Sequence, residues 1–258
     1  MGIFNNFFSS KNKTDVKQFK LNSEQNVKTK IVKQTIFGEE TEFNYSDFAN
    51  LKNNKYYHRF LTGELKLPTG KVVCTDPMYQ ALGKPQNWKI EKGNYKVYLY
   101  FGLEEDFAGR VAYAELVIKD VIPTYWELSL ISENDLEDDF EKKINGLYPV
   151  ERGLSCFTDY ETYKIFEKEV NDFYKLNKSG NFYIDILEKQ FRENENLTKD
   201  SYGEDWINYK PQNAIGNIIM FGTGYGDGLY PRYVGYDNNG EIVKFVTDFI
   251  QIITESEK

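Results

Sequence analysis

The residues best suited to support chemistry lie in a glycine-rich run near the C-terminus. Residues 221–236 contain five glycines, four tyrosines, one proline and one carboxylate. Glycine at this density lets the backbone turn at positive φ or lie close to another group. Asp227 stands between Gly226 and Gly228. It is predicted either to present a carboxylate on a tight loop or to hydrogen-bond its own turn as a structural residue.

Three other carboxylates could act together with Asp227. Asp76 ends a predicted strand, Asp159 precedes a predicted helix and Glu115 lies within a predicted strand. Grouped carboxylates can bind a divalent cation, bind an amine, or divide acid and base roles. Each residue also has a structural interpretation, because aspartate commonly ends a turn or caps a helix. Both interpretations stay open for all three residues.

A buried Glu115 would need a basic partner, because an unpaired buried charge is expensive. Arg110 and Arg232 are the bases expected to supply it. The tyrosines of the glycine run, Tyr230 among them, could form the floor of a binding surface or simply pack in the core. The candidate ligand-binding residues are therefore Asp227, Gly226, Gly228, Tyr230, Asp76, Asp159, Glu115 and Arg232.

Other familiar chemistries find little support in the sequence. The glycine run leads into a predicted strand, whereas a phosphate-binding glycine loop normally leads into a helix. His58 is the only histidine, so a nucleophilic dyad would have to join it to a cysteine such as Cys156. A buried, inert cysteine is the favoured interpretation. No metal site and no cofactor is predicted.

Composition limits the partners and the location. The formal net charge is −8, which disfavours nucleic acid and suits a basic protein partner. Two cysteines far apart in the chain favour a reducing, cytoplasmic setting. The N-terminus lacks the pattern of a secretion signal, and no stretch of about 18 apolar residues predicts a membrane span.

The pattern along the chain predicts one α+β domain over residues 27–258, preceded by a polar arm at 1–26. Alternating residues and turn signals predict a mainly antiparallel β body, sandwich or barrel-like, with a helical segment near 133–195 and a C-terminal β-meander. The turn at 68–70 predicts a hairpin between strands 59–67 and 71–76, and the turn at 237–240 predicts a second hairpin. Strands are predicted at 59–67, 71–76, 94–101, 110–118, 125–131, 214–221, 232–236 and 241–253, and helices at 45–56, 133–145, 158–177 and 182–194.

Four segments, at 63–77, 110–115, 153–159 and 221–249, together resemble a bacterial family of unknown function. Its mark is the element G-x-G-D-G-x-Y-P-x-Y-x-G-x-D, found here from Gly224 to Asp237 and followed by Thr247-Asp248-Phe249. The resemblance implies a class of protein and no activity. The residues favour a non-enzymatic binding protein of immunity type or regulatory role that masks a basic partner. The alternative is a small-ligand or metal-binding enzyme, hydrolase-like, with a carboxylate cluster centred on Asp227.

Overall fold

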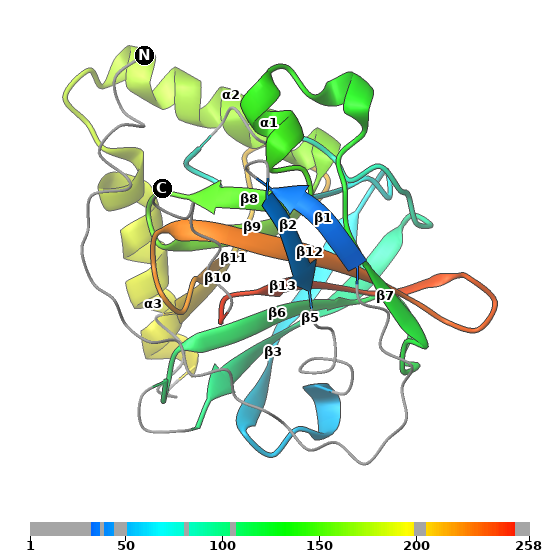
Figure 1. Ribbon diagram of the computed structural model, residues 1–258. Coiled ribbons are helices and arrows are strands. Elements are labelled where there is room, and N and C mark those ends of the chain that lie inside the picture. Colours follow the sequence, from blue (N-terminus) through cyan, green and yellow to red (C-terminus); the bar gives the residue numbers. More distant parts are fainter. Residues whose placement is uncertain are drawn as a thin grey trace.

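The computed structural model of the protein describes residues 32–36, 39–43, 51–79, 83–103, 107–198 and 205–250 (Figure 1). The predicted N-terminal arm at 1–26 lies outside these residues, as does the first part of the helix predicted at 45–56. The described part of that helix contains a single 3₁₀ turn, Leu51–Asn53.

Two antiparallel sheets form the body of the molecule. A seven-stranded sheet runs in the order β3 (Tyr57–Leu67), β5 (Gly93–Gly102), β6 (Val111–Val117), β13 (Ile242–Asp248), β12 (Gly228–Tyr236) and β7 (Tyr125–Leu128), with β8 (Leu147–Val150) also paired to β12. A four-stranded sheet runs in the order β10 (Trp206–Tyr209), β11 (Ile218–Gly222), β9 (Leu154–Asp159) and β4 (Val72–Thr75). The strands β1 (Val32–Ile36) and β2 (Glu39–Phe43) form a separate two-stranded sheet among the described residues.

The main core lies between these two sheets. Phe157 of β9 packs against Phe245 of β13 with ring centroids 5.4 Å apart, and so joins one sheet to the other. Leu65, Leu99 and Leu116 of the seven-stranded sheet belong to the same buried cluster. Full burial of such a side chain stabilises the fold by roughly 1.5–3 kcal/mol. The structure is therefore a sandwich rather than a closed barrel.

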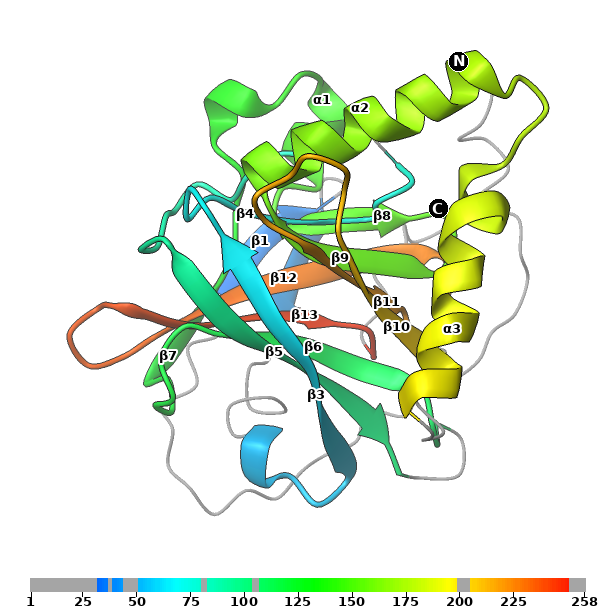
Figure 2. The same cartoon turned by 180° about the vertical axis from the view of Figure 1, so that it is seen from behind.

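Helices cover the outer face of the four-stranded sheet. They are α2 (Tyr160–Leu176), a π-helix (Tyr183–Leu187) and α3 (Glu188–Thr198). Figure 2 shows α2 and α3 beside β9, β10 and β11. The helix predicted at 158–177 is confirmed by α2, whose residues Tyr163, Phe166 and Val170 are buried against this sheet. No helix among the described residues is long and apolar enough to cross a membrane.

The segment at 133–145 forms a 3₁₀ turn (Glu133–Asp135) and the short helix α1 (Asp139–Lys143). Asp138 caps α1 by accepting the backbone N–H of Glu141. The helical character predicted here is confirmed, but β8 and β9 interrupt the predicted helical segment and were not expected. Strand β10 likewise lies where neither a strand nor a helix was predicted.

The hairpin predicted at 59–76 is wrong. Strands β3 and β4 lie in different sheets, since β3 pairs with β5 and β4 pairs with β9. The Asp159 carboxylate explains the change, because it accepts the backbone N–H of Thr69 at 2.8 Å and so draws the turn towards β9. Gly70, at φ +74°, then lies against the carbonyl of Ile90, where a Cβ would be only 2.0 Å from the oxygen.

The second predicted hairpin is confirmed, because β12 and β13 pair directly through the turn at 237–240. Strand β11, however, belongs to the four-stranded sheet. Residues 223–227 therefore carry the chain from one sheet to the other. The glycine run is not a hairpin turn but a corner between the two layers.

Candidate functional site

The corner made by the glycine run holds the turn between β8 and β9, at residues 151–153, which we call the 151–153 turn. The backbone N–H of Gly153 donates to Oδ1 of Asp227 at 2.8 Å. The carbonyl of Gly153 accepts the N–H of Thr223 at 2.9 Å. Both backbone polar groups of Gly153 are thereby satisfied by one short segment, which fixes the position of the turn.

The glycines of the corner serve this geometry. A Cβ at Gly224 would lie 2.3 Å from the ring of Phe107 and 2.4 Å from the carbonyl of Val111, so only glycine permits this approach. Gly226 has φ +82°, in the left-handed region. Its carbonyl accepts hydrogen bonds from the hydroxyl groups of Thr223 at 2.7 Å and of buried Tyr230 at 2.8 Å. The predicted candidates Gly226 and Tyr230 thus hold the loop in shape.

Asp76 holds the same turn at its first residue. Its Oδ2 accepts the backbone N–H of Glu151 at 2.9 Å, and its Oδ1 accepts that of Met78 at 2.8 Å. The side chain is 0 % exposed. Burial raises the pKa of Asp76 to about 6, although these two hydrogen bonds act to lower it. Two of the predicted carboxylates, Asp76 and Asp227, therefore meet at one turn.

Around this turn the surface is acidic. The pKa of Glu151 is raised by partial burial and by the charge of Asp227, while Arg152 opposes the shift. One carboxylate oxygen of Glu151, Oε1, is enclosed by protein atoms and accepts no hydrogen bond from the residues that the structure describes. The pKa of the nearby Tyr79 hydroxyl is raised by burial and then by Glu151 and Asp138. We call Asp138, Glu151 and Asp227 the acidic face.

Asp159 and Glu115 lie away from this turn. Asp159 caps α2 by accepting the N–H of Glu161 at 3.1 Å and also binds Thr69. It stands at the far end of β9 from the 151–153 turn, roughly 17 Å away for five strand steps. Glu115 lies on β6 in the other sheet. The structure therefore does not bring all four predicted carboxylates to one place.

Glu115 is buried in an ionic cluster, but its basic partners differ from those predicted. Its carboxylate accepts the hydroxyl of Tyr100 at 2.7 Å and lies 3.6 Å from both Arg59 and Lys244. Burial lowers the pKa of Lys244, and Glu115 opposes that shift. The pairing with Arg110 or Arg232 is wrong, since Arg110 donates instead to the carbonyl of Gly224 at 3.0 Å. Strand register places Lys244 and Arg59 beside Glu115, which spacing along the chain could not reveal.

Arg232 is 1 % exposed and lies between the sheets. Its guanidinium donates to the carbonyls of Cys74 at 3.2 Å and Leu147 at 2.9 Å, and it lies 5.4 Å from the ring of Tyr148. Burial lowers its pKa. No carboxylate lies within ion-pair distance among the described residues, and the Nε atom has no hydrogen-bond partner. Arg232 is a buried cation held by carbonyl oxygens.

Cys74 is buried between the two sheets, and Cys156 is buried between the four-stranded sheet and its helices. Burial raises the pKa of Cys74 to about 12 and that of Cys156 well above its ordinary value. Cys156 lies on β9 in the four-stranded sheet, whereas His58 lies exposed on β3 in the other sheet. The described residues contain no group of three or more His, Cys, Asp and Glu side chains placed to hold a metal ion.

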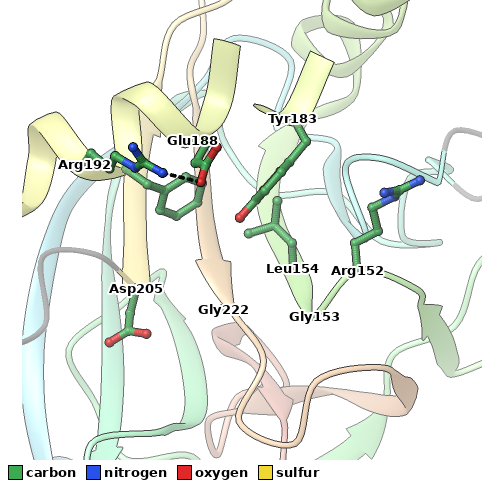
Figure 3. Close-up of a pocket in the computed structure, with 9 residues that line it drawn as sticks. Arg152, Gly153, Leu154, Tyr183, Glu188, Arg192, Asp205 and Gly222 are labelled. Carbon is green, nitrogen blue, oxygen red and sulfur yellow. Dashed lines mark hydrogen bonds and ion pairs between the residues drawn. The ribbon is translucent and has the colours of Figure 1, made fainter. Parts of the chain in front are cut away.

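A polar pocket of about 310 Å³ adjoins the 151–153 turn (Figure 3). We call it the Gly222 pocket, after the residue at its floor. Its walls come from the 151–153 turn, the end of β11, the π-helix and α3. The lining residues are Arg152, Gly153, Leu154, Tyr183, Glu188, Phe191, Arg192, Asp205 and Gly222.

Comparison with known families places the site within one family match. The family described as "protein of unknown function (DUF4241)" matches residues 65–247. The chain belongs to this family. The match contains Asp76, the 151–153 turn and the whole glycine corner. No curated protein and no solved structure shows significant similarity to the chain.

In this DUF4241 protein, the sequence indicates the glycine run as a candidate site but does not reveal the 151–153 turn that the run holds. Neither Glu151 nor the Gly222 pocket was expected, because β8 and β9 were not predicted. One signal was available: Gly153 lies between an acidic-basic pair and the apolar run that forms β9, as expected for a turn. Which residues would contact that turn depends on the tertiary fold.

Proposed function

We propose that the protein is a non-enzymatic binding protein whose acidic face receives a lysine or arginine side chain of a basic protein partner. The observation that carries the proposal is the environment of Glu151. Partial burial and then the charge of Asp227 raise the pKa of Glu151, and none of the described residues donates a hydrogen bond to its Oε1 atom. Oε1 itself is enclosed, but Glu151 is partly exposed, so a cationic donor that reaches the exposed part of this carboxylate would supply a counter-charge and a charged hydrogen bond.

The rigidity of the turn supports the same proposal. Asp76 fixes the backbone N–H of Glu151, and Asp227 fixes that of Gly153. The carboxylates are therefore held in position before any partner arrives, which reduces the entropy lost on binding. The net charge of −8 would also speed the approach of a basic partner.

The proposal places the protein in the bacterial cytoplasm, in an immunity-type or regulatory role. The alternative, a small-ligand or metal-binding enzyme centred on Asp227, has less support. Of its four carboxylates only Asp76 meets Asp227 at one turn, and the two oxygens of Asp76 already accept backbone N–H groups.

The proposal can be tested with labelled oligo-arginine and oligo-lysine peptides by fluorescence anisotropy at several salt concentrations. Glu151→Gln removes one charge and no hydrogen bond of the fold. Glu91→Gln removes the same charge from an exposed loop. We expect Glu151→Gln to weaken binding about tenfold, as the loss of one charged hydrogen bond does. The Glu91→Gln control should bind as the wild type does.

Two results would contradict the proposal. If Glu151→Gln binds like the wild type, Glu151 does not contact the basic group. If Glu91→Gln weakens binding by the same factor, the peptides respond only to total charge. A melting temperature measured for each variant separates either result from misfolding.

A further inference from the structure

Arg152 is the one cationic side chain of the 151–153 turn. It is exposed, and it forms no ion pair and no side-chain hydrogen bond with the residues that the structure describes. Glu151 precedes it in the chain, and Asp227 binds the turn one residue later, at Gly153. Partial burial and Asp227 raise the pKa of Glu151, and Arg152 opposes them, so the charge of Arg152 acts on the acidic face. Neither carboxylate, however, lies within ion-pair distance of the guanidinium.

The backbone that carries Arg152 is fixed on both sides. The N–H of Glu151 donates to Oδ2 of Asp76 at 2.9 Å. The N–H of Gly153 donates to Oδ1 of Asp227 at 2.8 Å. The backbone of Arg152 is therefore held in place, and only its side chain has to be ordered when a partner binds. This limits the conformational entropy that binding would cost.

The guanidinium of Arg152 is directed away from the Gly222 pocket. Figure 3 shows it pointing away from Tyr183 and from the far wall, where Glu188 forms a 2.7 Å ion pair with Arg192. The pocket therefore does not use the charge of Arg152. A molecule that approaches the 151–153 turn from outside can reach it.

An arginine in this position affects which partners the acidic face can bind. A partner that brings only basic groups places them near a like charge, which weakens its binding. Covering the guanidinium without a partner would remove its hydration and supply no interaction in return. A carboxylate removes both penalties, because it can accept two parallel hydrogen bonds from a guanidinium. Arginine is also enriched among the residues that dominate binding at protein interfaces.

We propose that Arg152 selects a partner whose binding segment carries an acidic residue beside a basic one. The basic side chain binds Glu151 at the acidic face, and the acidic side chain binds Arg152. The inference rests on the proposed function. It narrows the partner from any basic surface to one that carries neighbouring opposite charges.

Two labelled peptides that differ in one residue type test the inference by fluorescence anisotropy. In the first peptide, pairs of arginines alternate with single glutamines, and in the second, aspartate replaces each glutamine. Arg152→Gln should weaken the binding of the aspartate peptide about tenfold, because a charged hydrogen bond is lost. The same variant should bind the glutamine peptide as tightly as the wild type or more tightly, because a like charge is removed.

Two further variants separate this inference from the proposed function. Lys89→Gln removes an exposed cation elsewhere and should not change the ratio of the two affinities. Glu151→Gln should weaken the binding of both peptides. The melting temperature of each variant shows whether it still folds.

The outcomes distinguish the two proposals. If Arg152→Gln weakens the binding of both peptides equally, or of neither, the inference is wrong even where Glu151→Gln behaves as expected. If neither peptide binds the wild type, or if Glu151→Gln leaves both affinities unchanged, the proposed function fails and the inference fails with it.

Discussion

Asp227 accepts the backbone N–H of Gly153 at 2.8 Å, across the junction between the two sheets. This contact joins the glycine corner to the 151–153 turn. The contact explains why a carboxylate stands between two glycines. The glycines let the corner pass close to the turn, and Asp227 supplies the hydrogen-bond acceptor. The same carboxylate lies near Glu151 and raises its pKa. Asp227 thus has a structural contact and an electrostatic effect, and substitution can separate them.

Asp227→Ala removes both the acceptor and the charge, whereas Asp227→Asn keeps an acceptor and removes only the charge. We expect Asp227→Ala to lower the free energy of unfolding by about 1 kcal/mol, as the loss of one hydrogen bond does, and Asp227→Asn to lower it less. Both should lower the pKa of Glu151. Urea unfolding and carboxyl NMR measure these effects. Equal destabilisation by the two variants would show that the charge, not the hydrogen bond, holds the turn.

Asp76 should make stability depend on pH. Its pKa rises from 3.8 to about 6 on folding, because it is buried. The folded state therefore binds the proton more tightly, so this contribution to stability is complete below about pH 4 and is lost as the pH rises through 6. About two pKa units correspond to about 3 kcal/mol.

Comparison of the wild type with Asp76→Asn isolates this titration. Between pH 4 and pH 7, the free energy of unfolding of the wild type should fall relative to that of the variant by about 2.4 kcal/mol, as measured by urea unfolding. Parallel profiles for the two proteins would mean that Asp76 titrates normally in the folded state.

Shortening the side chain of Arg232 should destabilise the fold more than replacing it by an apolar side chain of similar length. Arg232→Ala leaves the carbonyls of Cys74 and Leu147 without donors and opens a cavity. We expect it to lower the free energy of unfolding by more than about 3 kcal/mol. Arg232→Met also loses the donors, but it fills the space and buries no charge, so its cost should be clearly smaller. A larger loss for methionine than for alanine in urea unfolding would contradict this account.

Both cysteines should resist alkylation in the folded protein. Cys74 and Cys156 are fully buried, and burial disfavours the reactive thiolate. At pH 8, iodoacetamide should modify them only as fast as the protein unfolds, and both should react promptly in concentrated urea. Mass spectrometry gives the rates. Rapid modification of Cys156 alone under native conditions would restore it as a candidate nucleophile.

The sequence predicted those features that depend on neighbours along the chain. Tyr163, Phe166 and Val170 recur at helical spacing, and Asp159 precedes them as a cap; α2 forms there as predicted. A strand was also predicted at 110–118, and β6 forms there with both of its faces buried. Short-range periodicity carries this information, because it reflects which face each element buries.

Features set by distant contacts could not be predicted. The turn at 68–70 has the residues of a hairpin, but the Asp159 carboxylate binds Thr69 and moves the turn to the other sheet. Glu115 was expected to pair with Arg110 or Arg232, but strand register places Lys244 and Arg59 beside it. The unsatisfied oxygen of Glu151 likewise arises only from the folded arrangement around the 151–153 turn.

The most direct test of the proposed function is the pKa of Glu151, measured by carboxyl ¹³C NMR with and without saturating oligo-arginine. The Glu151→Gln variant assigns the resonance. In the free protein the pKa should lie above that of an ordinary glutamate, because burial and Asp227 both raise it. A guanidinium bound at the acidic face must lower this pKa, and the proposal predicts a fall of one unit or more, about 1.4 kcal/mol. A pKa of Glu151 that is the same in the presence and absence of the peptide would contradict it.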